Sequence, residues 1–162
     1  MKTLEAQLGH AIALAANYHA DQFDKGGNPY ILHCLKVMHY TKSERLELKI
    51  AAVLHDIVED TEMTLLNLEL QGFNPVSLEI IDLLTKKEGQ SPEEYLAGIL
   101  KNHGACIVKL ADLRHNTDVR RLKGVTDKDL LRMRKYHAMH VKILQAKEAH
   151  EKINSLTGEV QQ

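Results

Sequence analysis

An adjacent histidine and aspartate, His55 and Asp56, come directly after the apolar run 51–54 (Ala-Ala-Val-Leu). Burying these polar groups costs free energy unless they pair or bind a cation, and together they offer one ion a nitrogen and an oxygen ligand. Glu59 and Asp60 follow, and on a helix they project over the same side. Such a carboxylate pair can position water or move protons. Alternatively, these residues form a hydrogen-bonded helix end and a solvated turn.

Two further polar residues lie in apolar surroundings, His33 within segment 29–35 and Asp112 within segment 107–113. A lone histidine on an apolar face is usually a core residue, whereas a buried aspartate needs an arginine, a helix N-terminus or a metal. With the preceding pair, they supply two imidazoles and two carboxylates. This mixed set suits a divalent transition metal and leaves coordination positions for water and substrate.

Helices are expected to position these residues, because apolar residues recur at helical spacing along most of the chain. Ser91 and Glu94 predict a capping box, with Pro92 at the first helical position. Segment 105–113 could be a strand by itself, but no other segment offers a convincing partner strand, so we interpret it as a buried helix. The expected helices cover residues 2–20, 29–40, 44–58, 64–71, 75 onward, 92–101, 105–113 and 127–153.

The sequence of 162 residues is long enough to bury the core of one domain without disulfides. We expect an all-α, single-domain helical bundle over residues 1–153 and a frayed tail at 154–162. Cys34 and Cys106 lie in apolar surroundings without CxxC spacing. This favours reduced, buried thiols in a cytoplasmic protein over a disulfide or a zinc site. The chain begins with an amphipathic pattern that does not resemble a signal peptide.

The composition argues against several partner classes. A formal charge of −1 and 4% aromatic residues without tryptophan argue against nucleic-acid binding. No apolar run is long enough to cross a membrane. The ten histidines are unusual, because histidine is the commonest metal ligand. Among those outside the cluster, we expect His10 and His19 near the surface of the first helix and His115 in a structural role. The sequence indicates no oligomeric state.

The order of the four clustered residues resembles the HD superfamily of metal-dependent phosphohydrolases. Three segments are similar to the hydrolase motifs of RelA/SpoT-type enzymes, which remove the 3′-pyrophosphate of guanosine penta- and tetraphosphate, (p)ppGpp. Residues 29–33 (PYILH) resemble PYIxHP with Cys34 in place of the proline, residues 55–61 (HDIVEDT) match HDxVEDT, and residues 109–116 (KLADLRHN) resemble KLADxxHN. The resemblance covers about residues 4–144 without a synthetase or regulatory domain, as in a stand-alone small alarmone hydrolase.

This resemblance implies an HD-type fold, a small nucleotide as substrate and one divalent metal ion, usually Mn²⁺ in this branch. The implied metal ligands are His33, His55, Asp56 and Asp112. The implied catalytic residues are Glu59 and Asp60. Among the residues expected to bind substrate, Lys25 and Asn116 match family positions. Lys109 is expected to join them because it is embedded between apolar residues close to Asp112.

The loop before the first motif departs from the family's pattern. There an arginine and a lysine often hold the nucleotide, whereas this sequence has Asp24 and Lys25. An aspartate cannot replace a stacking guanidinium, and near phosphates it would repel them. Lys25 could equally be a solvated loop residue.

Three hypotheses remain. The first is hydrolysis of (p)ppGpp at the 3′ position, which the carboxylate pair supports. The second is removal of a phosphate from another nucleotide or a dinucleotide cofactor such as NADPH, which the aspartate in the loop supports. The third is a non-catalytic nucleotide-binding module. The intact ligand set and carboxylate pair argue against it, because binding alone requires neither.

Overall fold

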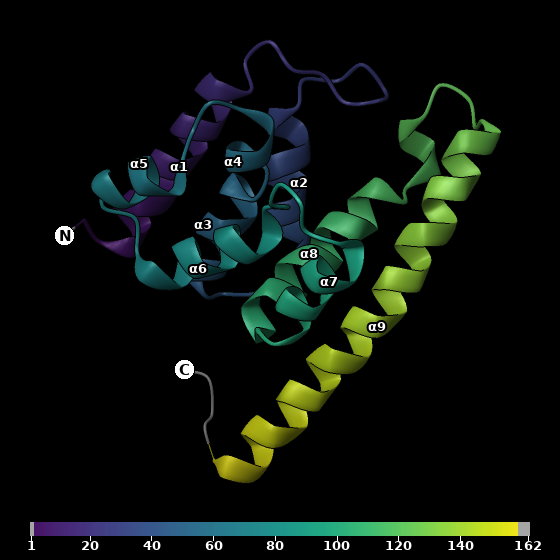
Figure 1. Ribbon diagram of the computed structural model, residues 1–162. Coiled ribbons are helices and arrows are strands. Elements are labelled where there is room, and N and C mark those ends of the chain that lie inside the picture. Colours follow the sequence, from purple (N-terminus) through teal and green to yellow (C-terminus); the bar gives the residue numbers. More distant parts are fainter. Residues whose placement is uncertain (1, 159–162) are drawn as a thin grey trace.

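The computed structural model describes residues 2–158, and this part of the chain consists of helices with short connections (Figure 1). The only β-pairing within that range is an isolated bridge between Phe23 and Pro29, so the all-α prediction is confirmed. The helices are α1 (Leu4–Tyr18), α2 (Ile31–Tyr40), α3 (Leu46–Leu54), α4 (Ile57–Asp60), α5 (Leu65–Leu70), α6 (Pro75–Leu84), α7 (Pro92–Leu100), α8 (His103–Asn116), the 3₁₀ turn η1 (Val119–Arg121) and α9 (Asp127–Thr157). Over the described residues, none of them has the length and apolar character needed to span a membrane.

Polar side chains before the helices fix where several of them begin. The Ser91 hydroxyl accepts the Glu94 N–H and the Glu94 carboxylate accepts the Ser91 N–H, so the expected capping box is present. Pro75 and Pro92 lie in the first turns of α6 and α7, where no backbone donor is needed. Other side-chain N-caps are Thr3, Thr64, Asn74, Asn102 and Thr126.

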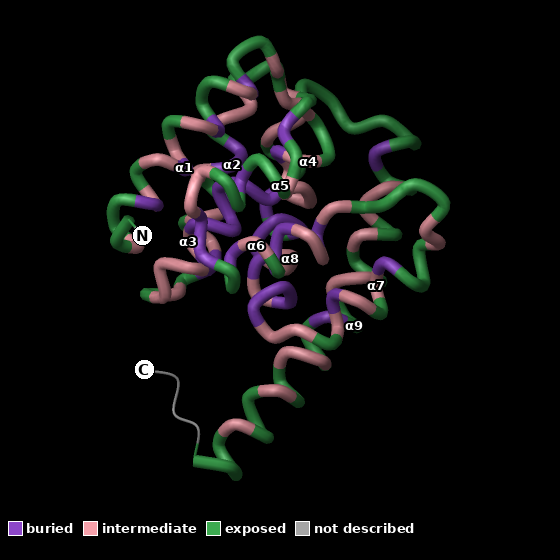
Figure 2. The backbone as a smooth tube through the Cα atoms, turned by 60° about the vertical axis from the view of Figure 1, so that its left-hand side comes forward, coloured by how far each residue is buried: buried purple, intermediate pink, exposed green. Residues whose placement is uncertain are grey.

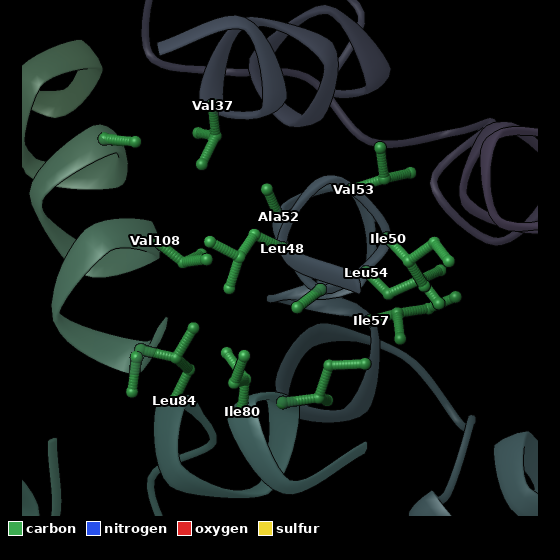
Figure 3. Packing of buried hydrophobic residues seen from close by; sticks show 14 of the residues in the cluster. Val37, Leu48, Ile50, Ala52, Val53, Leu54, Ile57, Ile80, Leu84 and Val108 are labelled. Atoms are coloured by element: carbon green, nitrogen blue, oxygen red, sulfur yellow. The ribbon is translucent and has the colours of Figure 1, made fainter. Parts of the chain in front are cut away.

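Helix α3 lies at the centre of the bundle, because α1, α2, α6 and α8 all pack against it. Six of its nine residues are buried, which leaves it apolar on nearly all sides. In Figure 3, Val37 from α2, Val108 from α8 and Ile80 from α6 point toward α3. The polar residues that follow α3 are therefore attached to the most tightly surrounded element of the fold.

Helix α9 packs along α8 and α7, and its last turns extend past the rest of the bundle (Figures 1 and 2). Of its 31 residues only Asp129 and Ile143 are buried. The helix continues to Thr157, past the expected end at residue 153, and the frayed tail over residues 154–162 stays a prediction. Residues 159–162 of that tail lie outside the described residues, and the domain boundary stays a prediction.

Candidate metal centre and active site

His55 and Asp56 form a turn between α3 and α4, so the single helix expected over residues 44–58 is wrong. Asp56 has φ −102° and ψ −4°, away from the values of about −63° and −42° in a regular helix. In such a helix, successive side chains diverge by about 100°. The turn instead brings His55 Nε2 to 2.8 Å from Asp56 Oδ2. Both side chains can therefore face the same point.

Three elements bring four side chains together at that point. His33 comes from α2, Asp112 from α8, and the other two from the turn after α3. His33 Nε2 lies 3.3 Å from Asp112 Oδ1 and 3.7 Å from Asp56 Oδ2. His55 Nε2 lies 3.6 Å from Asp112 Oδ1. The structure thus brings together all four residues named as ligands, although the ligand role of each stays a prediction.

Neighbouring side chains hold the two carboxylates in place. Lys109 Nζ lies 2.9 Å from Asp112 Oδ2, and Asn116 Nδ2 donates to Asp112 Oδ1 at 2.6 Å. The Tyr30 hydroxyl donates to Asp56 Oδ2 at 2.6 Å. Such contacts fix the orientation of groups that bind a metal. Lys109 and Asn116 therefore support Asp112 here, and their contact with substrate stays a prediction.

The two histidines are held through their Nδ1 atoms. His55 Nδ1 donates to the carbonyl oxygen of Ala52 at 2.9 Å, and His33 Nδ1 lies 2.7 Å from His115 Nδ1. Burial, together with the charges of Arg121 and His33, lowers the pKa of His115 to about 4. His115 is therefore neutral near pH 7, and its Nδ1 can accept a hydrogen bond from His33 Nδ1–H. This arrangement directs the Nε2 atom of each clustered histidine into the cluster.

The residues of the cluster fit a divalent metal. His33 Nε2 and His55 Nε2 are buried and face the carboxylate oxygens of Asp56 and Asp112. Such a facing of nitrogen and oxygen atoms is costly unless a proton or a cation lies between them. One ligand atom from each histidine and one from Asp112 all lie within 4.8 Å of one another. Asp56 adds a fourth donor beside them. Nitrogen and carboxylate oxygen together form a donor set that such ions take.

The electrostatics of the cluster also favour a cation. Burial opposes charge on His55, but the Asp56 and Asp112 carboxylates outweigh it and raise the pKa of His55 well above its ordinary value. Burial likewise opposes charge on the carboxylates. His55 beside Asp56 and Lys109 beside Asp112 nevertheless hold the pKa of each carboxyl well below its usual range. Both carboxylates therefore stay ionised at neutral pH.

Glu59 and Asp60 lie on α4, one turn after the cluster, and both are solvent-accessible. Glu59 Oε2 accepts the backbone N–H of Lys86 at 2.8 Å. Neighbouring protein atoms partly desolvate the Asp60 carboxyl, and with the carboxylates of Asp56 and Glu59 they raise its pKa. A carboxylate with a raised pKa is a better proton acceptor near neutral pH.

A cavity of about 380 Å³ opens over the cluster. The predicted functional residues that line it are Lys25, Asp56, Glu59, Asp60, Lys109, Asp112 and Asn116. The cavity wall also contains Arg121 and Arg132. The sequence could not distinguish these two arginines from others on the wet sides of helices, because their approach to the site depends on contacts between distant segments.

Asp24 lines the same cavity, but it is not a free charge there. Its Oδ2 lies 3.0 Å from Arg121 Nη2, and its Oδ1 accepts the backbone N–H groups of Gly26 and Asn28 at 2.9 Å each. Burial opposes charge on Asp24, but these contacts lower its pKa. The expected repulsion of phosphates is therefore offset by Arg121, which brings a guanidinium to the same wall.

The loop that carries Asp24 packs closely against the segment around η1, because a Cβ added to Gly26 would clash with the carbonyl oxygen of Arg121. Backbone cannot move aside as a flexible side chain can. We therefore expect Gly26→Ala to lower the free energy of unfolding by about 1–3 kcal/mol, measured by urea denaturation. The control is Gly124→Ala, because nothing lies within 4 Å of its added Cβ. An equal loss in both variants would contradict this reading.

His19 was expected near the surface, and that expectation is wrong, because only 1% of the residue is exposed. It follows the last turn of α1, where its Nδ1 donates to Gln22 Oε1 at 2.7 Å. Gln22 Nε2 in turn donates to the carbonyl oxygen of Asp60 at 2.9 Å. The His19 ring also lies 5.0 Å from that of Tyr30. His19 and Gln22 thus connect α1 to the end of α4 through hydrogen bonds. No local sequence pattern predicted these contacts.

The chain is similar to several known proteins over part of their length. The chain is 29% identical over 119 residues to a guanosine-3′,5′-bis(diphosphate) 3′-pyrophosphohydrolase of Borreliella burgdorferi. It is 30% identical over 121 residues to a GTP pyrophosphokinase of Streptomyces coelicolor, and 28% identical over 123 residues to the bifunctional (p)ppGpp synthase/hydrolase SpoT of Escherichia coli. These matches cover 65%, 68% and 68% of this chain but only 18%, 14% and 17% of the relatives. The chain therefore spans less than a fifth of their length.

A solved structure shares the fold. It is described as "A metazoan ortholog of SpoT hydrolyzes ppGpp and plays a role in starvation responses", and it matches with a TM-score of 0.70 at 22% identity. The match covers 96% of this chain and 97% of that chain. The HD domain family model matches residues 30–134, which is more than half of the sequence and includes all four clustered residues. The chain therefore belongs to the HD domain family.

Proposed function

We propose that this protein is a metal-dependent phosphohydrolase that removes the 3′-pyrophosphate of guanosine penta- or tetraphosphate. The observation that carries the proposal is the convergence of two histidines and two aspartates beneath a cavity whose wall holds a further carboxylate pair. The relatives named as 3′-pyrophosphohydrolases support the choice of substrate. In this reaction water attacks the phosphorus bonded to the 3′ oxygen, and the 3′ O–P bond breaks. The products are GDP or GTP and pyrophosphate.

The residues that would hold the ion are His33, His55, Asp56 and Asp112. When bound, a divalent ion lowers the pKa of a coordinated water and polarises a phosphoryl oxygen. The buried Nε2 atoms and the ionised carboxylates are already turned toward one another. Little rearrangement of the chain is therefore needed to form the site. Manganese is the proposed ion by family resemblance.

Glu59 and Asp60 position the attacking water and accept its proton. Asp60 is suited to accept a proton, because partial desolvation and the neighbouring carboxylates raise its pKa. Glu59 is held through its Oε2 by the N–H of Lys86, which fixes the direction of its carboxylate. The pair lies at the cavity wall, where the proton can pass on to solvent.

Cationic side chains in the cavity hold the phosphates of the substrate. Lys25, Lys109 and Arg121 line the wall, and Asn116 lies between Asp112 and Arg121. The two terminal nitrogens of Arg121 already donate to Asp24, His115 and Asn116, so we expect Arg121 to add positive charge to the wall and to hold Asn116 near the sugar. We expect Lys25 to contact a phosphate as a point charge. The buried, free thiols of Cys34 and Cys106 support a cytoplasmic protein.

The proposal is tested by incubating purified protein and Mn²⁺ with guanosine tetraphosphate, GTP, GDP and NADPH, and measuring phosphate and pyrophosphate release. Pyrophosphate from guanosine tetraphosphate is the expected result, and Asp56→Ala should abolish it. If phosphate or pyrophosphate were released only from the other compounds, the substrate would be another nucleotide or a dinucleotide cofactor and not guanosine tetraphosphate. Binding without any turnover would favour a nucleotide-binding module.

We expect metal binding to release about one proton per protein near pH 7. The Asp56 and Asp112 carboxylates raise the pKa of His55, so without metal His55 holds a proton that the ion must displace. The apparent affinity for Mn²⁺ should therefore fall as the pH falls, and it should level off above the pKa of His55. Calorimetry in two buffers with different ionisation enthalpies measures the proton count. An affinity independent of pH between 5 and 8 would contradict the prediction.

A further inference from the structure

A second cavity lies away from the cluster, between α8 and α9 beside the end of α2. Its volume is about 820 Å³, within the range of small-molecule sites, and it shares no lining residue with the cavity over the cluster. Its apolar side chains come mainly from α8 and α9. They include Ile107, Leu110, Leu113, Met133 and Leu144.

At one end of this groove, cations gather around a tyrosine. The guanidinium of Arg114 lies 4.2 Å from the centre of the Tyr40 ring, and the ammonium of Lys36 lies 5.5 Å from the same ring. Lys42 lines the groove beside them. Over residues 2–158, neither Arg114 nor Lys42 forms an ion pair with a carboxylate. Their hydrogen-bond donors are therefore available to an anion.

Lys42 also has an unusual backbone conformation. Its φ of 51° is the only positive φ at a non-glycine residue between positions 2 and 158. A residue other than glycine, asparagine or aspartate is uncommon in this region, because its Cβ crowds the backbone. Glycine would end α2 here without strain. Lys42 therefore occupies a position that favours glycine, and it lines the groove.

At the other end of the groove, a carboxylate and an ammonium neutralise each other. Glu151 Oε1 lies 2.6 Å from Lys147 Nζ and 3.7 Å from His103 Nε2. Between the two ends, the rings of His137 and His140 stack with centres 6.3 Å apart and offer polar atoms above the apolar floor. The groove thus combines a positive end, an apolar floor and a neutral end. This pattern complements a ligand with one anionic group and an uncharged body.

We propose that the groove between α8 and α9 is a second ligand site, which binds a phosphate monoester that carries an apolar or aromatic body. The phosphate contacts Arg114 and Lys42, where the guanidinium offers bidentate hydrogen bonds. The body covers Ile107, Leu110 and Leu144. A nucleoside monophosphate and an alkyl phosphate share this chemistry and differ in the body.

The test is a titration of methyl-labelled protein followed by NMR, with guanosine monophosphate, hexyl phosphate and inorganic phosphate as the probes. We expect saturable shifts of the Ile107, Leu110 and Leu144 methyls with at least one of the two esters. The dissociation constant of that ester should be at least about tenfold lower than that of inorganic phosphate. The ester that binds more tightly identifies the body as aromatic or aliphatic. Methyls of Leu65 and Leu78, at a separate cavity, should not move.

Two variants separate binding from folding. Arg114→Ala should raise the dissociation constant at least about tenfold, whereas Arg134→Ala, on an exposed part of α9 outside the groove, should leave it unchanged. Lys42→Gly should weaken binding without lowering Tm, because glycine adopts φ 51° freely.

Several results of the titration would overturn the proposal. These are an absence of shifts at the groove, shifts confined to the cavity over the cluster, binding of inorganic phosphate as tight as that of the esters, and equal binding by Arg114→Ala and the wild type. Groove shifts that depend on protein concentration alone would also overturn it, because they would identify a second copy of the chain as the occupant.

Discussion

Replacing His55 by glutamine is expected to lower kcat/KM for pyrophosphate release on the order of 10³-fold or more, because a bound ion contributes several kcal/mol to the transition state. Glutamine keeps a polar side chain of similar length but cannot supply the imidazole nitrogen that faces Asp112. The same change should remove the rise in Tm that Mn²⁺ gives the wild type. At a concentration of about 100 times the dissociation constant, that stabilisation amounts to about 2.7 kcal/mol.

The control for this variant is His39→Gln, because His39 is an exposed residue of α2 away from the cluster. It should retain both the activity and the stabilisation by metal. Circular dichroism of the two variants without metal shows whether His55→Gln still folds. Full activity in a folded His55→Gln protein would remove His55 from the ligand set, and the proposed ion would need another site.

The convergence of the four clustered residues could be predicted from the sequence because these residues conflict with their surroundings. His33 and Asp112 lie in helices whose neighbouring residues are apolar, so each needed a buried partner. Their order along the chain then matched one family. The helices themselves were predictable from apolar spacing and from caps such as Ser91. The turn at Asp56 was not, because the apolar stripe continues through Ile57 and gives no local sign of a break.

The cavity wall could not be predicted, because its contacts join distant segments. Asp24 and Arg121 are 97 positions apart, and no periodicity relates them. In the sequence, Asp24 was only an aspartate at a position where the family often has arginine. In the fold, its carboxylate holds Arg121 beside the cavity. His19 also lacked a signal, since a histidine at the end of an amphipathic helix is usually solvated. Its burial depends on Gln22 and Tyr30, which the following loop brings back toward α1.

Replacing Asp60 by asparagine is expected to lower kcat by ~10²–10⁴ while leaving the affinity for Mn²⁺ unchanged, because in the proposed reaction Asp60 accepts a proton but does not belong to the cluster. Partial desolvation and the carboxylates of Asp56 and Glu59 raise its pKa, so the wild-type rate should increase with pH as Asp60 loses its proton. Asparagine has no such proton to lose. The small residual rate of the variant should therefore lack that part of the pH dependence.

The matched control for Asp60 is Glu62→Gln, which removes an exposed carboxylate two residues further along the same segment. It lies outside the cavity over the cluster, so its activity and pH profile should follow the wild type. Measuring kcat from pH 5 to 9 and the Mn²⁺ affinity by calorimetry separates proton transfer from metal binding. If Asp60→Asn lost metal as well as activity, Asp60 would be a support of the cluster. If it kept the wild-type pH profile, Glu59 alone would be the proton acceptor, since it is the other carboxylate on α4 that faces the cavity.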